Sequence, residues 1–219
     1  MKDLIIFGTG DYARIASVYI ARETERRVAA FAVDGQYLDR SDLAGHPVVA
    51  FDDLLNTHPP DSFAMLVAIG FSRLNAARTE VYQRCKQLGY DFISHVSPSA
   101  YNIGQVEVGE NTFVFEANVL QPFVRIGANC VLWSGNHIGH DSTIDDNCFL
   151  ASHIVVSGNC GVGHSCFIGV NATLRDGVKV APRCIIGAGA VILKDTQEGE
   201  VYSVRRTEPR DLKSWDVKL

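Results

Sequence analysis

Every sixth residue from Val108 to Ile192 is aliphatic, and this regularity constrains the fold more than any other feature of the chain. With 47% of all residues hydrophobic, fifteen consecutive matches arise by chance with odds of about one in 10⁵. A period of six is neither helical nor simple strand alternation. It indicates a parallel β-helix of hexapeptide repeats, in which each coil buries its inner face only by stacking on the next. The repeat positions are Val108, Val114, Leu120, Ile126, Leu132, Ile138, Ile144, Leu150, Val156, Val162, Ile168, Leu174, Val180, Ile186 and Ile192.

Two further sets of residues recur every eighteen positions, which is three hexads, and so predict a three-sided coil. One set consists of cysteines that each precede a repeat aliphatic by two: Cys130, Cys148, Cys166 and Cys184. The other set is Asn111, Asn129 and Asn147, continued in step by Ser165 and Arg183. Asparagine suits a tight corner because it tolerates left-handed backbone. The cysteines, with Cys160 at an equivalent position, should pack inward, and none forms a CxxC pair.

Composition excludes several classes of partner. The 219 residues suffice for two compact domains, and the net charge of −5 leaves no basic stripe for a nucleic-acid backbone. The apolar run Leu4 to Phe7 is far too short for a signal segment or a membrane span. We therefore expect a cytoplasmic protein without nucleic-acid or membrane partners.

Residues 1–100 alternate between strand and helix patterns, which predicts a parallel, doubly wound α/β domain. We expect strands at 4–7, 27–34, 48–49, 63–70 and 91–96, a helix at 11–23, a short helix at 51–55, and a helix from Ser72 to Leu88 that Ser72 caps. Residues 97–99 should link this domain to a prism over residues 101–204. Residues 205–219 form a tail.

The turn after the first strand reads Gly8-Thr9-Gly10-Asp11-Tyr12-Ala13, a G-x-G-x-x-A fingerprint. Glycines let the backbone approach a phosphate, and the helix N-terminus supplies amide donors. Alternatively, the glycines only permit a tight turn. About 100 residues provide one mononucleotide-binding half, which favours a nucleotide or nucleotide sugar over a redox dinucleotide. Asp34 is placed to reach ribose hydroxyls, and the predicted lining of the same crevice is Gly70, Ser72, Arg73 and Asn75.

His140 is the candidate catalytic base. It follows the inward Ile138 by two positions, so it should project outward at a corner, with Gly158 eighteen residues later on the next coil. Coils stack about 4.8 Å apart. An imidazole beside a glycine N–H offers acyl transfer a base and an oxyanion donor. The alternative for His140 is a solvated surface histidine. His137 is a substrate contact or a bystander, and a metal site from these two histidines lacks a third ligand.

The combination of domains resembles the bacterial nucleotide-sugar acetyltransferases, which include 4-amino-sugar N-acetyltransferases and sialic acid O-acetyltransferases. The resemblance covers the chain to about Val201 and implies a Rossmann-like first domain followed by a left-handed parallel β-helix. It also implies that His140 is the general base, that Asp141 raises its basicity, and that Gly158 donates to the thioester carbonyl.

The same resemblance implies acetyl-CoA as co-substrate and a homotrimer with active sites between subunits. The acetyl-CoA groove would then pass Val170, Gly187 and Ala188. The sugar nucleotide would contact residues of the first domain: Gly8, Gly10, Asp11, Tyr12, Asp34, Gly70, Ser72 and Arg73. Two adjacent cations near the end of the prism, Arg205 and Arg206, suit the phosphates of CoA.

The sequence therefore predicts a trimeric acetyltransferase acting on the amino group of a nucleotide-linked sugar. Acetylation of a sugar hydroxyl is the nearest alternative, because it uses the same base and donor. A nicotinamide-dependent oxidoreductase and a non-catalytic scaffold are the alternatives from other classes.

Overall fold

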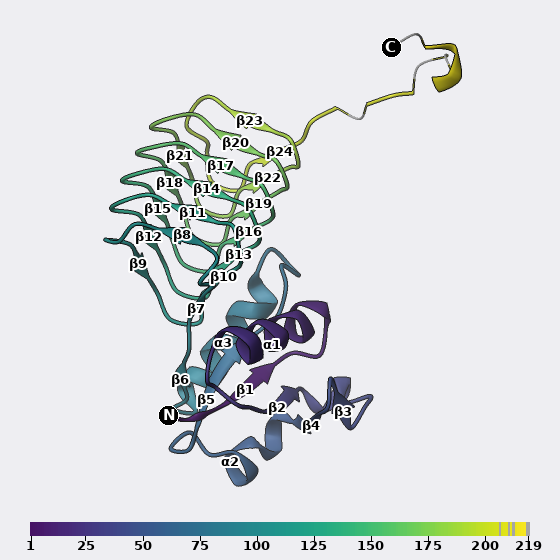
Figure 1. Cartoon of the computed structure of the whole chain (residues 1–219), viewed down its shortest axis with the longest axis vertical. Helices are drawn as coiled ribbons and strands as arrows, with labels where there is room; N and C mark the ends of the chain where they lie inside the picture. The colour runs from purple at the N-terminus through teal and green to yellow at the C-terminus, as the bar shows by residue number, and fades with distance from the viewer. Residues whose placement is uncertain (206, 210, 212, 218–219) are drawn as a thin grey trace.

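The computed structural model describes residues 1–205, 207–209, 211 and 213–217. Figure 1 shows two parts, a sheet with helices at the N-terminal end and a tall prism of stacked coils above it. The chain leaves the last coil as an extended tail that carries the short turn η3 (Ser214–Asp216). No helix among the described residues is long and apolar enough to cross a membrane.

The N-terminal part is a six-stranded sheet in the order β3-β4-β2-β1-β5-β6, parallel except for the β3–β4 pair. Its strands are β1 (Asp3–Phe7), β2 (Val28–Val33), β3 (Asp42–Leu43), β4 (His46–Ala50), β5 (Phe63–Val67) and β6 (Asp91–Phe92). Its helices are α1 (Asp11–Glu23), η1 (Gly35–Tyr37), η2 (Phe51–Asp53), α2 (Leu54–Thr57) and α3 (Ala76–Gln87).

Both faces of this sheet are covered, as the continuous apolar run of β1 requires. Leu4 and Ile6 pack into the cluster that contains α1, whereas Ile5 and Phe7 pack into the cluster that contains α3. The two helices therefore lie on opposite faces. Helix α1 has the predicted bounds.

The prediction that Ser72 caps the helix after β5 is wrong. Arg73, Leu74 and Asn75 have φ of 52°, 50° and 66°, and α3 begins only at Ala76 with Asn75 as its N-cap. Consecutive left-handed residues cannot belong to a right-handed helix. Asn75 is fully buried and donates from Nδ2 to the carbonyl of Cys166, 3.0 Å away, so a contact with the prism holds this turn.

All fifteen repeat aliphatics point into the prism, each as the second residue of a two-residue strand. All but Val108 are buried, and they form one continuous core with the inward cysteines. From Val108 to Ile186, the residue three positions after each aliphatic turns the corner with positive φ, including Asn111, Asn129 and Asn147 as predicted. From β7 to β23 the backbone ladder joins each strand residue to one eighteen positions away, so the coil is three-sided.

The predicted packing role of five cysteines is confirmed. Cys130, Cys148, Cys160, Cys166 and Cys184 are at most 1% exposed. Each thiol donates to a backbone carbonyl in the neighbouring coil, as Cys148 does to Gly163 at 3.2 Å. Burial raises the pKa of Cys148 well above that of a free thiol. A thiol whose pKa is raised in this way is poorly suited to act as a nucleophile.

The N-terminal part covers one face of the prism, which we call the aromatic face. Its outward side chains include Phe113, Phe149 and Phe167, and Phe113 and Phe149 share a hydrophobic cluster with α1. The sequence predicted one strand at 91–96, but the structure has two there: β6 belongs to the N-terminal sheet, and the second is the first strand of the aromatic face. The strands are β7 (His95–Val96), β10 (Phe113–Val114), β13 (Val131–Leu132), β16 (Phe149–Leu150), β19 (Phe167–Ile168), β22 (Ile185–Ile186) and β24 (Val201–Tyr202).

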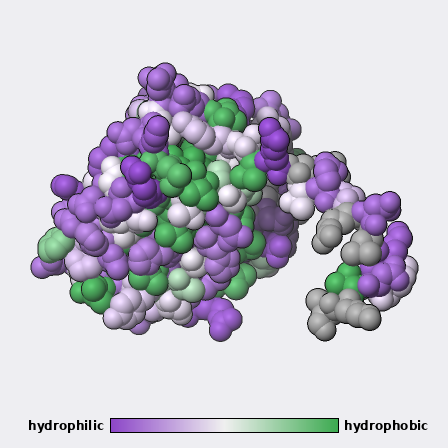
Figure 2. Space-filling view, turned by 90° about the horizontal axis from the view of Figure 1, so that it is seen from above, coloured by the Kyte–Doolittle hydropathy of each residue, from purple (hydrophilic) through white to green (hydrophobic). Residues whose placement is uncertain are grey.

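The outward side chains of the other two faces are exposed or half-buried. We call one the apolar face, from its outward residues Tyr101, Val119, His137, Val155, Thr173 and Val191, and the other the charged face, from Glu107, Arg125 and Lys179. The apolar face consists of β8 (Tyr101–Asn102), β11 (Val119–Leu120), β14 (His137–Ile138), β17 (Val155–Val156), β20 (Thr173–Leu174) and β23 (Val191–Ile192). The charged face consists of β9 (Glu107–Val108), β12 (Arg125–Ile126), β15 (Thr143–Ile144), β18 (Gly161–Val162) and β21 (Lys179–Val180). Seen along the prism from above, apolar residues also gather at its end (Figure 2).

Buried polar contacts lock the two parts together. Arg78, fully buried on α3, donates to the carbonyls of Gly70 at 2.9 Å and of Asn129 and Cys148 at 3.1 Å. Tyr19 on α1 donates to Glu116 at 2.6 Å, and this hydrogen bond raises the pKa of Tyr19 to about 12. Because an unpaired buried charge is costly, these contacts favour a single relative placement of the two parts.

The asparagine ladder at one corner should contribute measurable stability. Asn129 is fully buried, accepts from Asn111 at 2.7 Å and donates to Asn147 at 2.8 Å. Asn159 has the same φ of 56° at another corner but is exposed, so Asn159→Ala is a matched control. We expect Asn129→Ala to lower the free energy of unfolding by roughly 2–4 kcal/mol more than the control, because two buried hydrogen bonds are lost. Chemical denaturation measures both; equal losses would contradict a role for the ladder.

Candidate active site

His140 and Gly158 lie on neighbouring coils at the edge between the apolar and charged faces. A methyl group added to Gly158 would meet His140 Nε2 at 2.6 Å and Cε1 at 2.8 Å. The imidazole therefore occupies the space over Gly158 that a side chain would fill. Only glycine at position 158 leaves room for the ring in this place.

Asp141 fixes the orientation of the ring. His140 Nδ1 lies 2.8 Å from Asp141 Oδ2, and the positive φ of 57° at Asp141 belongs to the corner itself. A neutral imidazole that donates from Nδ1 to a carboxylate keeps the lone pair on Nε2. The nitrogen able to accept a proton is thus the one next to Gly158. The side chain of His140 is 53% exposed, so a substrate can reach it.

Hydrogen bonds hold the backbone of His140 in place, whereas the N–H of Gly158 has no acceptor among the described residues. The N–H of His140 donates to Gln121 Oε1 at 2.8 Å, and its carbonyl accepts from Asn159 at 2.8 Å. At the equivalent position of another corner, the N–H of Ala128 is taken by Asp146 at 2.7 Å. Within the described part of the chain, the N–H of Gly158 donates to no group. Sequence reasoning missed Gln121, because nothing in its position signals a contact with a backbone amide.

A hollow of about 530 Å³ borders Asp141, the partner of the His140 ring. It is lined by Gln105, Val106, Glu107, Phe123, Arg125 and Asp141. Phe123 is 55% exposed and lies one coil below Asp141 in the same corner column, so the hollow offers an apolar surface beside charged groups. This combination suits a sugar, whose C–H faces are apolar and whose hydroxyls are polar.

A second cavity of about 980 Å³ lies in the N-terminal part, at the carboxyl ends of its strands. It brings together most of the residues that the sequence singled out there: Gly8, Gly10, Asp11, Tyr12, Asp34, Gly70, Ser72 and Arg73. The prediction that Asn75 also lines it is wrong, because Asn75 is buried against the prism. Helix α1 begins at this cavity, and its N-cap, Gly10, supplies no side-chain hydrogen bond. The first amides of α1 are therefore available to an anion.

Three residues in this cavity have partners that the sequence did not reveal. Asp34 pairs with Arg84 on α3, with Oδ1 to Nη2 at 2.7 Å, and Arg73 pairs with Glu80. The side chain of Tyr12 is 7% exposed and packs against Phe113 of the prism, with ring centroids 6.1 Å apart. Burial raises the pKa of Tyr12. Tyr12 is thus an interdomain residue, and we expect it to offer a ligand its main chain only.

The residues predicted to bind acetyl-CoA lie at a different edge. Val170, Gly187 and Ala188 follow β19 and β22, so they occupy the corner between the aromatic and apolar faces. Val170 and Gly189 are joined by a backbone hydrogen bond of 2.8 Å, which places them on adjacent coils. Within one chain the apolar face separates Val170, Gly187 and Ala188 from His140.

His137 points outward from the apolar face. It pairs in register with Val119 and Val155 and does not line the nucleotide cavity.

Arg205 is exposed just after the last strand, and Arg206 lies outside the described residues.

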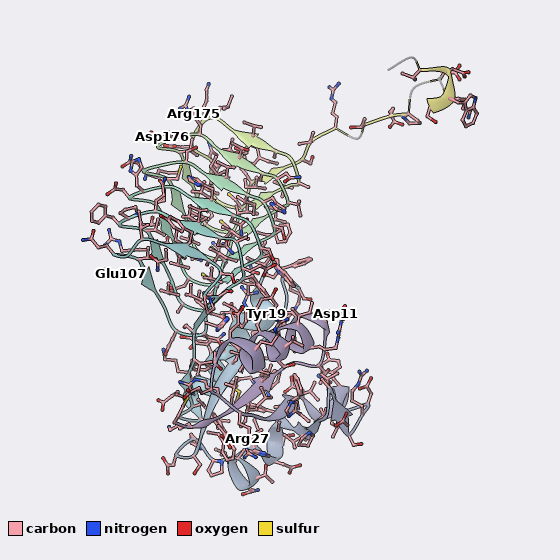
Figure 3. The ribbon with its side chains drawn as sticks, in the orientation of Figure 1. Asp11, Tyr19, Arg27, Glu107, Arg175 and Asp176 are labelled. Carbon is pink, nitrogen blue, oxygen red and sulfur yellow. The ribbon has the colours of Figure 1, made fainter. Side chains whose placement is uncertain are left out.

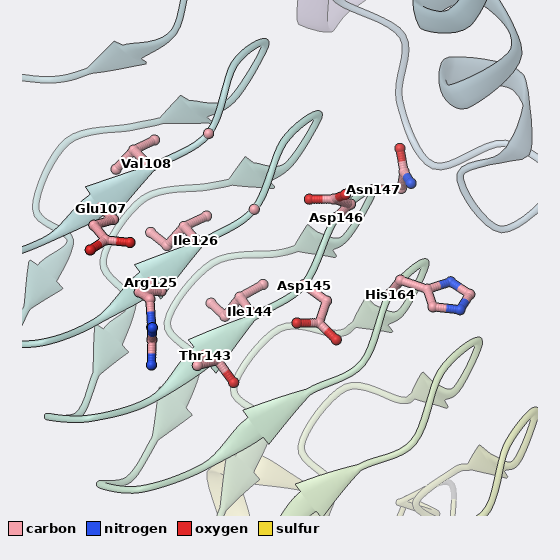
Figure 4. Close-up of a pocket in the computed structure, with 12 residues that line it drawn as sticks. Glu107, Val108, Arg125, Ile126, Thr143, Ile144, Asp145, Asp146, Asn147 and His164 are labelled. Carbon is pink, nitrogen blue, oxygen red and sulfur yellow. The ribbon is translucent and has the colours of Figure 1, made fainter.

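On the charged face, a further hollow of about 810 Å³ is lined by Glu107, Arg125, Asp145, Asp146 and His164 (Figure 4). None of the residues predicted for a site lines it.

Part of the chain matches a family model, and the whole fold is similar to that of several solved structures. A family model described as bacterial transferase hexapeptide (six repeats) matches residues 159–194. No curated protein matches the sequence significantly. The solved structure of PerB from Caulobacter crescentus, in complex with CoA and GDP-perosamine, is similar with 25% identity, 93% of both chains covered and a TM-score of 0.80.

Two other structures extend this similarity. A perosamine N-acetyltransferase from the same organism, with a histidine mutated to asparagine, has 24% identity, a TM-score of 0.83 and covers 92% of this chain and 93% of its own. The acetyltransferase domain of PglB from Neisseria gonorrhoeae has 22% identity, a TM-score of 0.81 and covers 92% and 96% respectively. The shared fold therefore includes both the N-terminal part and the prism.

The two glycines of the nucleotide cavity should respond differently to substitution. Gly8 has φ of +126°, and an added methyl group would lie 2.7 Å from the carbonyl oxygen of Ala68, whereas nothing lies within 4 Å at Gly10. We expect Gly8→Ala to cost more than about 3 kcal/mol of unfolding free energy, and Gly10→Ala less than about 1 kcal/mol. Thermal and urea unfolding test this; equal losses would contradict the close approach at Gly8.

Proposed function

We propose that the protein is an acetyl-CoA-dependent N-acetyltransferase that acts on the amino group of a nucleotide-linked amino sugar. The observation that carries the proposal is His140 Nε2 placed beside Gly158, whose N–H is free among the described residues. Similarity to PerB bound to CoA and GDP-perosamine, over 93% of both chains, supports it. The related perosamine N-acetyltransferase has been studied with a histidine replaced by asparagine or alanine.

The proposed reaction is direct transfer. The amine attacks the thioester carbonyl while His140 Nε2 accepts one of its protons, and Asp141 stabilises the resulting imidazolium. The N–H of Gly158 stabilises the oxyanion. The carbon–sulfur bond then breaks, and the CoA thiolate takes the proton from the imidazolium. No acyl-enzyme is needed, because the two substrates meet in one site.

We assign residues 1–100, apart from β7, as a Rossmann-like nucleotide-sugar-binding domain, residues 101–204 together with β7 as a left-handed β-helix, and residues 205–219 as a tail. The turn of Gly8 and Gly10 and the start of α1 would hold the diphosphate. Asp34, which pairs with Arg84, would accept hydrogen bonds from hydroxyl or N–H groups of the nucleoside. A protein using these substrates would act in the cytoplasm, where both are made.

The active site would form between subunits of a homotrimer. In one chain, the nucleotide cavity belongs to the part that covers the aromatic face, whereas His140 lies at the far edge of the apolar face. Val170, Gly187 and Ala188 lie at the near edge of that face. A neighbouring prism packed on the apolar face would bring its own His140 toward these residues, with Arg205 and Arg206 beside the CoA phosphates.

A thermal-shift panel tests the two-substrate proposal. UDP-, GDP-, CMP- and dTDP-linked amino sugars are each added with and without acetyl-CoA. We expect one nucleotide class to stabilise the protein and acetyl-CoA to stabilise it independently. Hydroxylamine then separates amide from ester products, because only esters are cleaved. Absence of stabilisation by acetyl-CoA would favour the scaffold alternative. NAD is included in a separate sample, and stabilisation by NAD would favour the oxidoreductase alternative.

Removal of the proposed base should abolish turnover without unfolding the protein. We expect His140→Ala to lower kcat by about 10²–10⁴-fold, because a positioned base is lost. His164→Ala is the control, since His164 is an exposed histidine at another corner. Steady-state kinetics measure kcat for both variants, and circular dichroism shows whether each variant keeps its fold. Near wild-type kcat in His140→Ala would show that the base is assigned to the wrong residue.

Mixed oligomers test whether two subunits build one site. His140→Ala and Arg84→Ala are each expected to be nearly inactive, because one lacks the base and the other weakens the nucleotide cavity. When the two variants are co-expressed, some interfaces combine an intact base with an intact cavity, so activity should return to a fraction of wild type. A mixture no more active than its components would contradict an intersubunit site.

A further inference from the structure

A carboxylate stands on the other side of Gly158 from His140. Asp176 is eighteen residues beyond Gly158, one coil higher in the same corner column, and Figure 3 shows it near the upper end of the prism. A methyl group added to Gly158 would lie 3.0 Å from Asp176 Oδ1 and 2.6 Å from His140 Nε2. The two atoms therefore flank one point, and their separation cannot exceed the sum of these distances.

This carboxylate is uncommitted. Asp176 is exposed and, among the residues that the structure describes, it forms no ion pair and no side-chain hydrogen bond. The acid at the equivalent hexad position of another corner, Asp146, is instead occupied by the N–H of Ala128. Unlike Asp146, Asp176 accepts no hydrogen bond from a backbone N–H among the described residues. Its Oδ1 flanks the same point at Gly158 as His140 Nε2, the atom proposed to accept the substrate proton.

The pair of acceptors fits an amine better than a hydroxyl. A nitrogen that hydrogen-bonds at about 2.9 Å to each of two acceptors can bridge a gap of this size. A neutral primary amine has two N–H bonds, so one proton can pass to His140 while the other stays hydrogen-bonded to Asp176. A hydroxyl has one proton, and once that proton points at His140, Asp176 meets oxygen lone pairs.

We propose that Asp176 is a specificity-determining residue that binds the acceptor amine and selects it over a hydroxyl. This inference rests on the proposed acetyltransferase function and deepens it. As the amine nitrogen bonds to the thioester carbon it gains positive charge, which the carboxylate of Asp176 stabilises. The proton lost goes to His140 and then to the CoA thiolate; the remaining N–H of the new amide leaves Asp176 with the product.

The test compares Asp176→Asn and Asp176→Ala with wild type and with the control Asp146→Asn. Each protein is assayed with acetyl-CoA and a panel of UDP-, GDP-, CMP- and dTDP-linked 4-amino sugars, and with the 4-hydroxyl counterpart of each. For the amine that wild type uses best, we expect both Asp176 variants to lose about 10- to 100-fold in kcat/KM, since a charge-assisted hydrogen bond is lost. Turnover of the matching hydroxyl compound should be unchanged or higher, and the control should resemble wild type.

The possible outcomes separate the two proposals. An unchanged ratio of amine to hydroxyl turnover in the Asp176 variants overturns the role of Asp176 and leaves the acetyltransferase function standing. Equal losses on both acceptors also overturn it, because they indicate a general structural role. Ester formation by wild type as its main activity contradicts selection of amines. No transfer to any acceptor by wild type overturns the acetyltransferase function itself.

Discussion

The stacking of one aliphatic side chain on another, coil after coil, is the interaction on which the rest of the structure depends. The repeat residues pack on the equivalent residues above and below them within one continuous core, so the register of the chain is fixed over the whole prism. An insertion of one residue would turn every later inward side chain outward. The unbroken interval of eighteen residues is therefore what places His140, Gly158 and Asp176 in one column.

The aromatic face provides the second constraint. Phe113, Phe115 and Trp133 give the N-terminal part an apolar surface to cover, and Arg78 satisfies carbonyls of several coils at once. This attachment fixes where the nucleotide cavity stands relative to the prism. Among the described residues, the same arrangement leaves Tyr101, Val155 and Val191 of the apolar face exposed.

The sequence predicted those features that depend on local or periodic patterns. The hexad register, the left-handed corners at Asn111, Asn129 and Asn147, the packing of five cysteines and helix α1 were all readable in this way. So was the proximity of His140 to Gly158, because a solenoid converts sequence interval into distance. The roles of the predicted site residues stay predictions.

Features set by contacts between distant segments were not predictable. The left-handed turn before α3 depends on Asn75 reaching Cys166, and the pairing of Asp34 depends on Arg84, fifty residues away. Tyr12 belongs to a nucleotide-binding fingerprint by sequence, yet its ring is buried against the prism. In each case tertiary packing outweighed the local signal, and no periodicity links the partners.

The most direct test of the central claim is a crystal structure of the protein with a non-hydrolysable thioether analogue of acetyl-CoA. The quantity to measure is the distance from the carbonyl oxygen of the acyl group to the amide nitrogen of Gly158. The account predicts about 2.9 Å, with the acyl carbon facing His140 Nε2 and the CoA chain passing Val170 and Ala188 of a second subunit. An acyl group bound at any other corner of the prism would contradict it.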